Sequence, residues 1–264
     1  MMKKITTIEE IQDIQFDMMM YVKRIAQKNN IKVMLSGGTL LGAARHQGFI
    51  PWDDDVDLML MRKDYEKLIK CIERDKQSRY RVMTIKNTPT YPFSFAKIVD
   101  TKTRVNMNKE MAIENMGVAA DIFPIDALPK DAGARKKMMT VYGKLVYTVF
   151  DIRDTNYRKL ERGFSYRMKT FGARMCSRII GVLARMYSVE KATHVAVVMG
   201  QYKEKEIMKK EDMMYQTEVT FRGETFLAPR GYQKYLTSLY GKNYMSLPPK
   251  AWQRPKHAIN AYWI

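Results

Sequence analysis

The chain has 264 residues, 46% hydrophobic and 11% aromatic, so it is long enough to bury a core and is not a disordered protein. Its 46 Lys and Arg against 28 Asp and Glu give a formal net charge of +18, which favours anionic partners such as nucleotides, nucleic acid, acidic glycans or anionic lipid. Two cysteines without a CxxC pair indicate neither a disulfide framework nor a structural zinc site. The sequence shows no apolar leader and no membrane-spanning run, so we expect a cytoplasmic protein.

The chain begins with a predicted α/β unit. Thr7 and Glu10 form a capping box ahead of a helix with apolar residues at helical spacing, which we expect to end at Asn29 and Asn30. Strands then alternate with helices. We expect strands at residues 31–35, 56–61, 80–85, 93–99 and 117–123, and helices at residues 40–46 and 63–74.

The pattern changes at residue 131. Segments rich in Lys, Arg and Met predict helices as far as about residue 214, and the last segment, residues 221–264, is turn-rich and aromatic. The expected fold class is α/β (α+β), a mixed sheet flanked by helices with a helical annex. We expect a catalytic core at residues 1–130, a basic helical region at residues 131–215 and a C-terminal segment at residues 216–264 that packs back on the core.

Four acids occupy five positions at the start of the second strand: Asp53, Asp54, Asp55 and Asp57. Such a run can be a solvated turn. Asp57, however, lies inside an apolar strand, where an uncompensated carboxylate costs free energy. Strand alternation places Asp55 and Asp57 on the same face. Paired oxygen ligands of this kind suit Mg²⁺ or Mn²⁺, so we expect a metal site.

A glycine pair precedes the acids. Gly37 and Gly38 follow a strand and open a helix, so backbone N–H groups are free and no Cβ atom blocks an approaching phosphate. Ser36 and Thr39 add hydroxyl donors. An isolated pair of this kind is more often an ordinary tight turn, but the adjacent acids favour phosphate binding.

A third acid stands in a later strand. Asp121 lies among apolar residues before a Phe-Pro pair, an unusual position for an idle charge, and we predict that it completes the metal site from a neighbouring strand. Asp126 precedes Ala127 and is interpreted as a structural residue in a cap or turn.

These motifs resemble a known family. The runs LSGGTLLGAARH at residues 35–46 and GFIPWDDDVD at residues 48–57 are similar to the signature of LicD-type phosphotransferases, and FAKI at 95–98, DIFPID at 121–126 and PRGY at 229–232 extend the similarity. The resemblance implies a nucleotidyltransferase-like fold. It also implies transfer of phosphocholine, or of a related phospho-polyol, from a CDP-linked donor to a hydroxyl of a cell-surface glycan or its lipid-linked precursor. Fukutin-like ribitol-phosphate transferases belong to the same superfamily.

This chemistry assigns expected roles. Asp55, Asp57 and Asp121 would hold Mg²⁺ or Mn²⁺ at the donor phosphates, and Asp121 is favoured as the base that accepts the proton of the acceptor hydroxyl. Arg45 and Lys97 are candidates for neutralising phosphate charge, although an ordinary surface charge is nearly as well supported for Lys97.

The choice of donor depends on the residues around the transferred group. CDP-choline is the favoured donor, and an aromatic face should receive its quaternary ammonium group. Trp52 is the nearest candidate, with packing against the sheet an equal alternative. His46 is interpreted as an orienting or structural residue. His257 is a site candidate by resemblance, although a histidine in a tail is more often merely exposed.

Residues 167–186 predict a basic amphipathic helix. Such a helix can lie on an anionic membrane surface, but a helix packed in the core with a solvated basic side is the favoured interpretation. Its apolar face comprises Met168, Phe171, Met175, Ile179, Val182 and Met186, and its basic face Arg167, Arg174, Arg178 and Arg185.

Two other classes of function stay open. A nucleotidyltransferase acting on nucleic acid or on a small molecule would use the same glycine pair and acids, but no nucleic-acid-binding module is recognised and no nucleic-acid partner is expected. A catalytically inactive scaffold of a glycan pathway is the non-enzyme alternative, and the presence of all three acids disfavours it.

Overall fold

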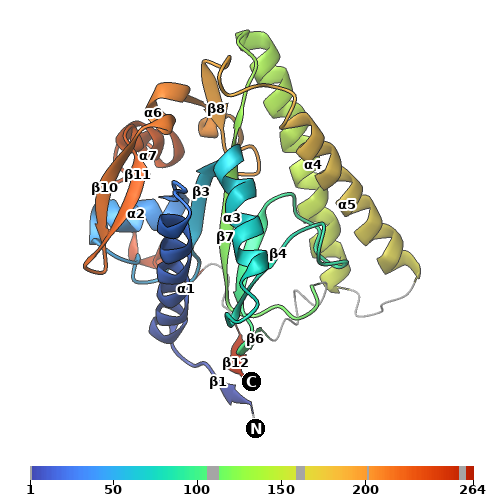
Figure 1. Cartoon of the computed structure of the whole chain (residues 1–264), viewed down its shortest axis with the longest axis vertical. Helices are drawn as coiled ribbons and strands as arrows, with labels where there is room; N and C mark the ends of the chain where they lie inside the picture. Colours follow the sequence, from blue (N-terminus) through green and yellow to red (C-terminus); the bar gives the residue numbers. More distant parts are fainter. Residues whose placement is uncertain (1, 106–112, 159–163, 201, 256–259) are drawn as a thin grey trace.

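The centre of the molecule is a mixed β-sheet, visible edge-on in Figure 1. The computed structural model describes residues 2–105, 113–158, 164–200, 202–255 and 260–264, with the side chains of residues 152–158 and 164–166 outside the description. The described strands of this sheet are β2 (Met34–Leu35), β3 (Asp57–Met61), β4 (Tyr80–Met83), β5 (Ala96–Asp100), β7 (Ala119–Ala127), β8 (His194–Ala196), β9 (Met208–Lys209), β10 (Gln216–Phe221) and β11 (Glu224–Pro229).

The strand order mixes segments that are far apart in the chain. It runs β10-β11-β2-β3-β7-β5-β4, with β8 paired to the end of β7 and β9 paired to β8. β3 is parallel to β7 and β11 is parallel to β2, whereas the other pairs are antiparallel. The expected mixed α/β sheet flanked by helices is therefore confirmed.

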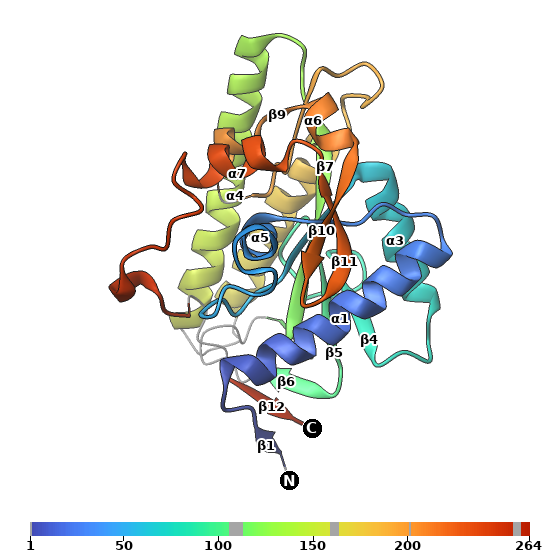
Figure 2. The same ribbon diagram turned by 90° about the vertical axis from the view of Figure 1, so that its left-hand side faces the viewer.

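Helices cover both faces of the sheet, as Figures 1 and 2 show. A small second sheet joins the two ends of the chain in the order β1-β12-β6. The helices are α1 (Ile8–Lys28), α2 (Gly37–His46), α3 (Arg62–Arg74), α4 (Ala132–Arg158), α5 (Phe164–Leu183), α6 (Lys210–Met214) and α7 (Tyr232–Tyr240), with short 3-10 helices η1 (Lys203–Glu206) and η2 (Lys250–Trp252); the small sheet consists of β1 (Lys3–Lys4), β6 (Thr103–Val105) and β12 (Ala261–Trp263).

Local sequence signals account for the first helices. The Thr7 hydroxyl accepts a hydrogen bond from the Glu10 amide at 3.2 Å, as the capping box predicts, and α1 ends before Asn29. The inward residues predicted for α3 are also the ones that are buried, namely Tyr65, Leu68, Ile69 and Ile72.

The sheet separates two hydrophobic cores. Ala96 and Ile98 of β5 pack in the core that contains α1, α2 and α3, whereas Val99 packs in the core formed with α4 and α5. Successive side chains of a strand point to opposite faces, so Lys97 lies on the same side as Val99, toward α4. The functional face of the sheet is therefore the one turned to α4.

Two sequence predictions for the second half of the chain were wrong. The helical pattern ends at Leu183 rather than near residue 214, because the Val-rich segment around β8 is buried and pairs with the end of β7. Residues 216–229, where no strand was predicted, form a hairpin whose second strand lies beside β2. In both places long-range strand pairing prevails over the local pattern. No helix in the described part of the chain has the length and apolar character needed to cross a membrane.

Candidate active site

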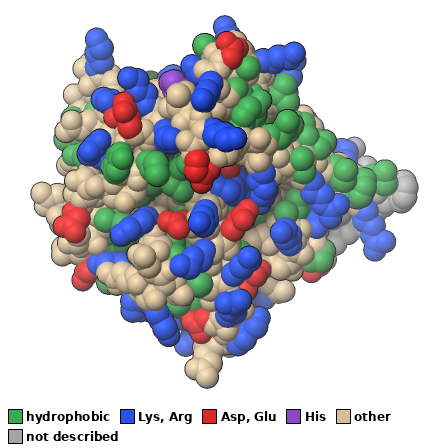
Figure 3. Space-filling view, turned by 45° about the horizontal axis from the view of Figure 1, so that its top comes forward, with side chains coloured by type: hydrophobic (Ala, Val, Ile, Leu, Met, Phe, Trp, Pro, Cys, Tyr) green, Lys and Arg blue, Asp and Glu red, His purple; other side chains and the backbone are tan. Residues whose placement is uncertain are grey.

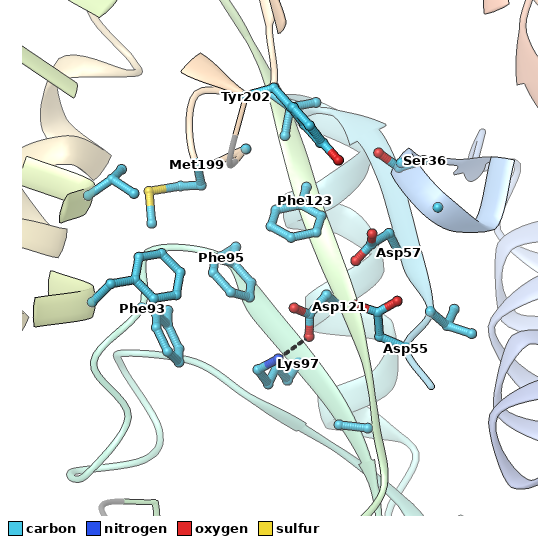
Figure 4. Close-up of a pocket in the computed structure, with 18 of the residues that line it drawn as sticks. Ser36, Asp55, Asp57, Phe93, Phe95, Lys97, Asp121, Phe123, Met199 and Tyr202 are labelled. Atoms are coloured by element: carbon cyan, nitrogen blue, oxygen red, sulfur yellow. Dashed lines mark hydrogen bonds and ion pairs between the residues drawn. The ribbon is translucent and has the colours of Figure 1, made fainter. Parts of the chain in front are cut away.

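Three functional side chains share one row across the sheet. Asp57 of β3 is the register partner of Asp121 of β7, and Asp121 is in turn the partner of Lys97 of β5. Directly opposed residues on neighbouring strands point to the same face, so these three side chains converge. Lys97 forms an ion pair with Asp121, and Figure 4 shows Asp121 between Asp57 and Lys97. The expected neighbouring strand for Asp121 is confirmed by this pairing.

The glycine pair is required by the position of the acids. Gly37 has a φ of +47°, and a Cβ atom on it would lie 2.7 Å from Asp57 Oδ2. A Cβ atom on Gly38 would lie 2.7 Å from Asp53 Oδ2. Thr39 does not line the cavity but accepts a hydrogen bond from the Asp57 amide at 2.9 Å. The turn thus fits closely against the carboxylates and leaves no space for side chains.

Two buried glutamines hold the acidic loop, and the sequence analysis missed them. Gln12 Nε2 donates to the carbonyl oxygen of Asp53 at 2.8 Å, and Gln15 Nε2 donates to that of Asp54 at 3.0 Å. Both glutamines lie on the buried side of α1, where a polar residue needs a partner. Their position beside Ile11 and Ile14, on the apolar face of the predicted helix, is the sequence pattern that could have identified them as buried polar residues.

The row of charged residues opens onto a cavity of about 490 Å³ between the sheet and α4. This volume lies in the range of small-molecule sites. Both Asp55 and Asp57 line it, as strand alternation predicts. Figure 4 shows the polar wall on one side and, on the other, an aromatic wall that also includes Met199. The polar wall includes Ser36, Gly37, Gly38, Asp53, Asp55, Asp57, Lys97 and Asp121, and the apolar wall Phe93, Phe95, Phe123, Val146, Phe150 and Met199.

The electrostatics of the polar wall are unfavourable for a bare carboxylate. Burial raises the pKa of Asp57 well above its usual value, and the negative charges of Asp55, Asp121 and Asp53 raise it further. The positive charge of Lys97 acts in the opposite direction. The fold therefore brings several acids together although their repulsion is only partly offset.

This donor set suits a hard divalent cation. Carboxylate oxygens from Asp55, Asp57 and Asp121 are the ligands that Mg²⁺ and Mn²⁺ prefer, and a cation would relieve the repulsion that raises the pKa of Asp57. Among the described residues no three His, Cys, Asp or Glu side chains already form a closed cluster. A site that substrate phosphates complete needs no such cluster, so these three acids stay the predicted ligands.

A buried carboxyl group reaches the cavity from the C-terminal half. Tyr235 donates a hydrogen bond to Glu206 Oε2 at 3.0 Å, and its hydroxyl lies 3.3 Å from Ser36 Oγ. Burial raises the pKa of Glu206 to about 7, although the hydrogen bond from Tyr235 lowers it. The sequence analysis did not single out this network because Glu206 lies in a charged run that is typical of a solvated surface.

Several predicted site residues lie outside the cavity wall. Arg45 Nη1 donates to the carbonyl oxygens of Tyr244 and Ser246, both at 3.0 Å, so it anchors the C-terminal segment. Trp52 is partly buried and its ring meets His46 edge-on at 6.3 Å between centroids. Neither Arg45, His46 nor Trp52 lines the cavity.

The last two interpretations concern Asp126 and His257. Asp126 is structural, as expected, but it lies inside β7 and accepts two hydrogen bonds from Arg62, at 2.7 and 2.6 Å, rather than forming a cap. His257 lies outside the described residues, so its role stays a prediction.

Comparison with known proteins agrees with this geometry. Residues 30–127 match the LicD/FKTN/FKRP nucleotidyltransferase domain, a span that contains the glycine pair, the acidic loop, Lys97 and Asp121. This segment is therefore similar to the LicD-family nucleotidyltransferase domain. The fold expected from the resemblance is therefore confirmed for the part of the chain that carries the polar wall.

Two curated relatives give the LicD-family match a wider context. The lipopolysaccharide cholinephosphotransferase LicD of Haemophilus influenzae is 27% identical over 268 residues, covering 99% of this chain and 99% of the relative. The human ribitol 5-phosphate transferase FKRP is 48% identical over 44 residues, covering 17% of this chain and 9% of the relative. Both names describe transfer of a phosphorylated group, so the relationship supports phosphoryl-group transfer as the reaction class.

Proposed function

We propose that the protein transfers phosphocholine from CDP-choline to a hydroxyl group of a glycan, with Mg²⁺ or Mn²⁺ as cofactor. The observation that carries this proposal is the cavity with an acidic wall facing an aromatic wall. A CDP-linked choline needs both walls. The acids would hold the divalent ion that binds its anionic diphosphate, and the aromatic rings would receive its transferred end, which is a cation without hydrogen-bond donors. The Haemophilus influenzae relative, which matches along 99% of both chains, is named as a cholinephosphotransferase.

The donor phosphates would lie at the polar wall. Ser36 and the Gly37-Gly38 turn face the cavity at the start of α2, where backbone N–H groups and the helix dipole favour an anion. Asp55, Asp57 and Asp121 would hold the divalent ion, which would supply positive charge to neutralise the donor phosphates and the leaving CMP. Lys97 adds a positive charge to the same wall.

Transfer needs a group that accepts one proton. The acceptor hydroxyl oxygen forms a bond to the phosphorus of phosphocholine, the bond from that phosphorus to the CMP oxygen breaks, and the hydroxyl proton moves to a carboxylate. We assign this role to Asp121, because it lies on a different strand from Asp57 and its carboxylate lines the cavity.

The aromatic wall is the proposed site for choline. Phe95 and Phe123 lie 4.6 Å apart between ring centroids, and both border the cavity. The Lys97 ammonium already lies 5.4 Å from the Phe95 ring centroid, so this surface accepts a cation. We therefore transfer the role first considered for Trp52 to Phe95, Phe123 and their neighbours.

The test compares donors in one assay. Purified protein is incubated with CDP-choline, CDP-ribitol or CDP-glycerol, a glycan acceptor and Mg²⁺ or Mn²⁺, and release of CMP is measured with and without EDTA. We expect metal-dependent release from CDP-choline, and loss of that release in Asp57→Asn. Use of CDP-ribitol alone would overturn the choline proposal, and undiminished release in EDTA would overturn the metal proposal.

A further inference from the structure

Helix α5 exposes an apolar face to solvent. The favoured expectation was that this face packs in the core, and the structure contradicts it, because Ala173, Ile180 and Ala184 on the opposite side of the helix are the buried residues. The exposed side chains form one stripe along α5 and the turn after it. Its members, between 37% and 68% exposed, are Met168, Phe171, Met175, Ile179, Val182 and Met186.

The stripe is long and continuous. Its residues recur every three or four positions, and the five that belong to α5, from Met168 to Val182, lie on one side of the helix and span about 21 Å at a rise of about 1.5 Å per residue. Single exposed apolar residues are ordinary, but a contiguous row of six marks a surface that meets something apolar. α4 covers only the buried side of α5.

Basic residues border the stripe, and α5 itself contains no Asp or Glu. Arg167 and Arg178 are exposed on the flank of the stripe. Figure 3 shows hydrophobic side chains along the projecting edge of the molecule with Lys and Arg beside them. The face therefore combines an apolar centre with a cationic border.

Two other arginines of the predicted basic face serve a different purpose. Arg174 donates to the carbonyl oxygens of Ile85 at 2.7 Å and Tyr91 at 2.9 Å, and Arg185 forms an ion pair with Glu66 at 2.8 Å. These contacts fix α5 to the body of the protein. The stripe is consequently held outward on a helix whose inner side is anchored.

We propose that this face binds the surface of a membrane containing anionic phospholipid. An apolar helix face enters the boundary between headgroups and acyl chains, and the flanking arginines meet the negative lipid charge. A second copy of the chain is a less suitable partner for this face, because an identical α5 would offer no acidic side chain to Arg167 and Arg178. The proposal goes beyond the phosphotransferase function and does not depend on it.

The location of the face would bring the cavity close to lipid. α4 packs against α5 and contributes Met139, Val146 and Phe150 to the cavity wall. Packed helices are about 8–10 Å apart, so the bound surface would be only one helix away from the proposed donor site. An acceptor carried by a lipid would then be within reach of the cavity without leaving the membrane.

The experiment measures sedimentation of the full chain with vesicles, without nucleotide or metal. Vesicles of phosphatidylcholine alone are compared with vesicles of phosphatidylcholine and phosphatidylglycerol. We expect binding to the anionic vesicles only. The double change Phe171→Ser and Val182→Ser should abolish it, and Arg167→Gln with Arg178→Gln should weaken it roughly 25-fold, since each charge near an anionic surface contributes about fivefold.

Matched control variants distinguish binding through the stripe from nonspecific hydrophobic adsorption and from nonspecific electrostatic attraction. Leu247 and Trp252 are 60% and 73% exposed, so Leu247→Ser with Trp252→Ser removes similar apolar surface elsewhere and should leave binding unchanged. Lys242→Gln with Arg254→Gln removes two exposed charges away from α5. Thermal unfolding of every variant should match that of the wild type, because all these side chains are exposed.

Two results would overturn the proposal. One is that the wild-type protein stays in the supernatant with anionic vesicles, or that the α5 variants bind these vesicles as strongly as the wild type does. The other is a dimer in sedimentation velocity that Phe171→Ser and Val182→Ser dissociate, which would make the stripe an interface between two copies.

Discussion

Asp57 and Asp121 occupy the same register position on the parallel strands β3 and β7. Their carboxylates therefore face one cavity from two separate segments of the chain, with Lys97 beside Asp121 on the next strand. The arrangement places like charges together in a protein with a net charge of +18, so it costs stability unless a ligand compensates it. That cost can be measured.

Asp57→Asn should abolish transfer and stabilise the metal-free protein at pH 8. The folded-state pKa of Asp57 lies above its unfolded-state pKa, so the folded state loses stability as the pH rises from the unfolded-state value through the folded-state value. An Asn side chain cannot ionise, so the variant does not lose this stability. Thermal unfolding in EDTA measures the stability, and CMP release measures transfer. Asp126→Asn is the contrast, because it leaves Arg62 without its buried partner and should destabilise by about 3–5 kcal/mol. A lower melting temperature of Asp57→Asn would contradict the prediction.

Gly37→Ala should remove donor binding, whereas Gly223→Ala should not. Both glycines have positive φ, +47° and +76°, so each substitution should cost about 1 kcal/mol of stability. Only the Cβ atom at Gly37 meets a carboxylate, at 2.7 Å, while that at Gly223 meets open space. Calorimetric titration with CDP-choline and metal distinguishes the two variants. Equal affinities would show that the close fit of the turn is unimportant.

Glu206→Gln should change how stability depends on pH. Because burial raises the pKa of Glu206 to about 7, the wild type should lose up to about 3 kcal/mol of unfolding free energy as the pH rises from about 4.5 to about 7, where the folded-state carboxyl ionises. The Gln variant should lack this loss. Denaturant unfolding at several pH values measures it, with the exposed Glu218→Gln as a control that keeps the wild-type profile. Parallel profiles for wild type and Glu206→Gln would refute the assignment.

Phe123→Leu should weaken binding of CDP-choline more than binding of CMP. The ring lies in the aromatic wall, and loss of one cation–π contact of about 1–2 kcal/mol raises the dissociation constant about 5- to 30-fold. Trp52→Leu is the control, because Trp52 meets His46 and does not line the cavity. Calorimetry with both ligands provides the ratio. A selective loss in Trp52→Leu and none in Phe123→Leu would restore the assignment based on sequence.

Arg45→Met should loosen the C-terminal segment without weakening donor binding. The Arg45 guanidinium donates to the carbonyl oxygens of Tyr244 and Ser246, so its loss leaves both without their charged donor. We expect faster proteolysis near these residues and a dissociation constant for CDP-choline within about twofold of the wild type. A drop in affinity of more than about tenfold, as expected for a phosphate ligand, would contradict the structural role.

The sequence by itself determined the first helices of the chain and the common face of Asp55 and Asp57. The cap at Thr7 and the apolar spacing of α1 and α3 are properties of short segments, so their patterns predict them correctly. The glycine pair and the acids that follow it lie between residues 36 and 57, and one strand period places Asp55 and Asp57 on one face. Short-range geometry is enough for each of these predictions.

Only the tertiary structure decided which residues meet. A local pattern predicts the period of a strand or helix but not the partner that covers it, so it could not place β11 beside β2 or bring Glu206 and Tyr235 to Ser36. For the same reason the sequence could not show that Arg45 and Trp52, although close to the motif in the chain, do not line the cavity. The apolar face of α5 is the clearest case, because its spacing is the same whether the face is buried or exposed, and the packing of α4 against the other side leaves it in solvent.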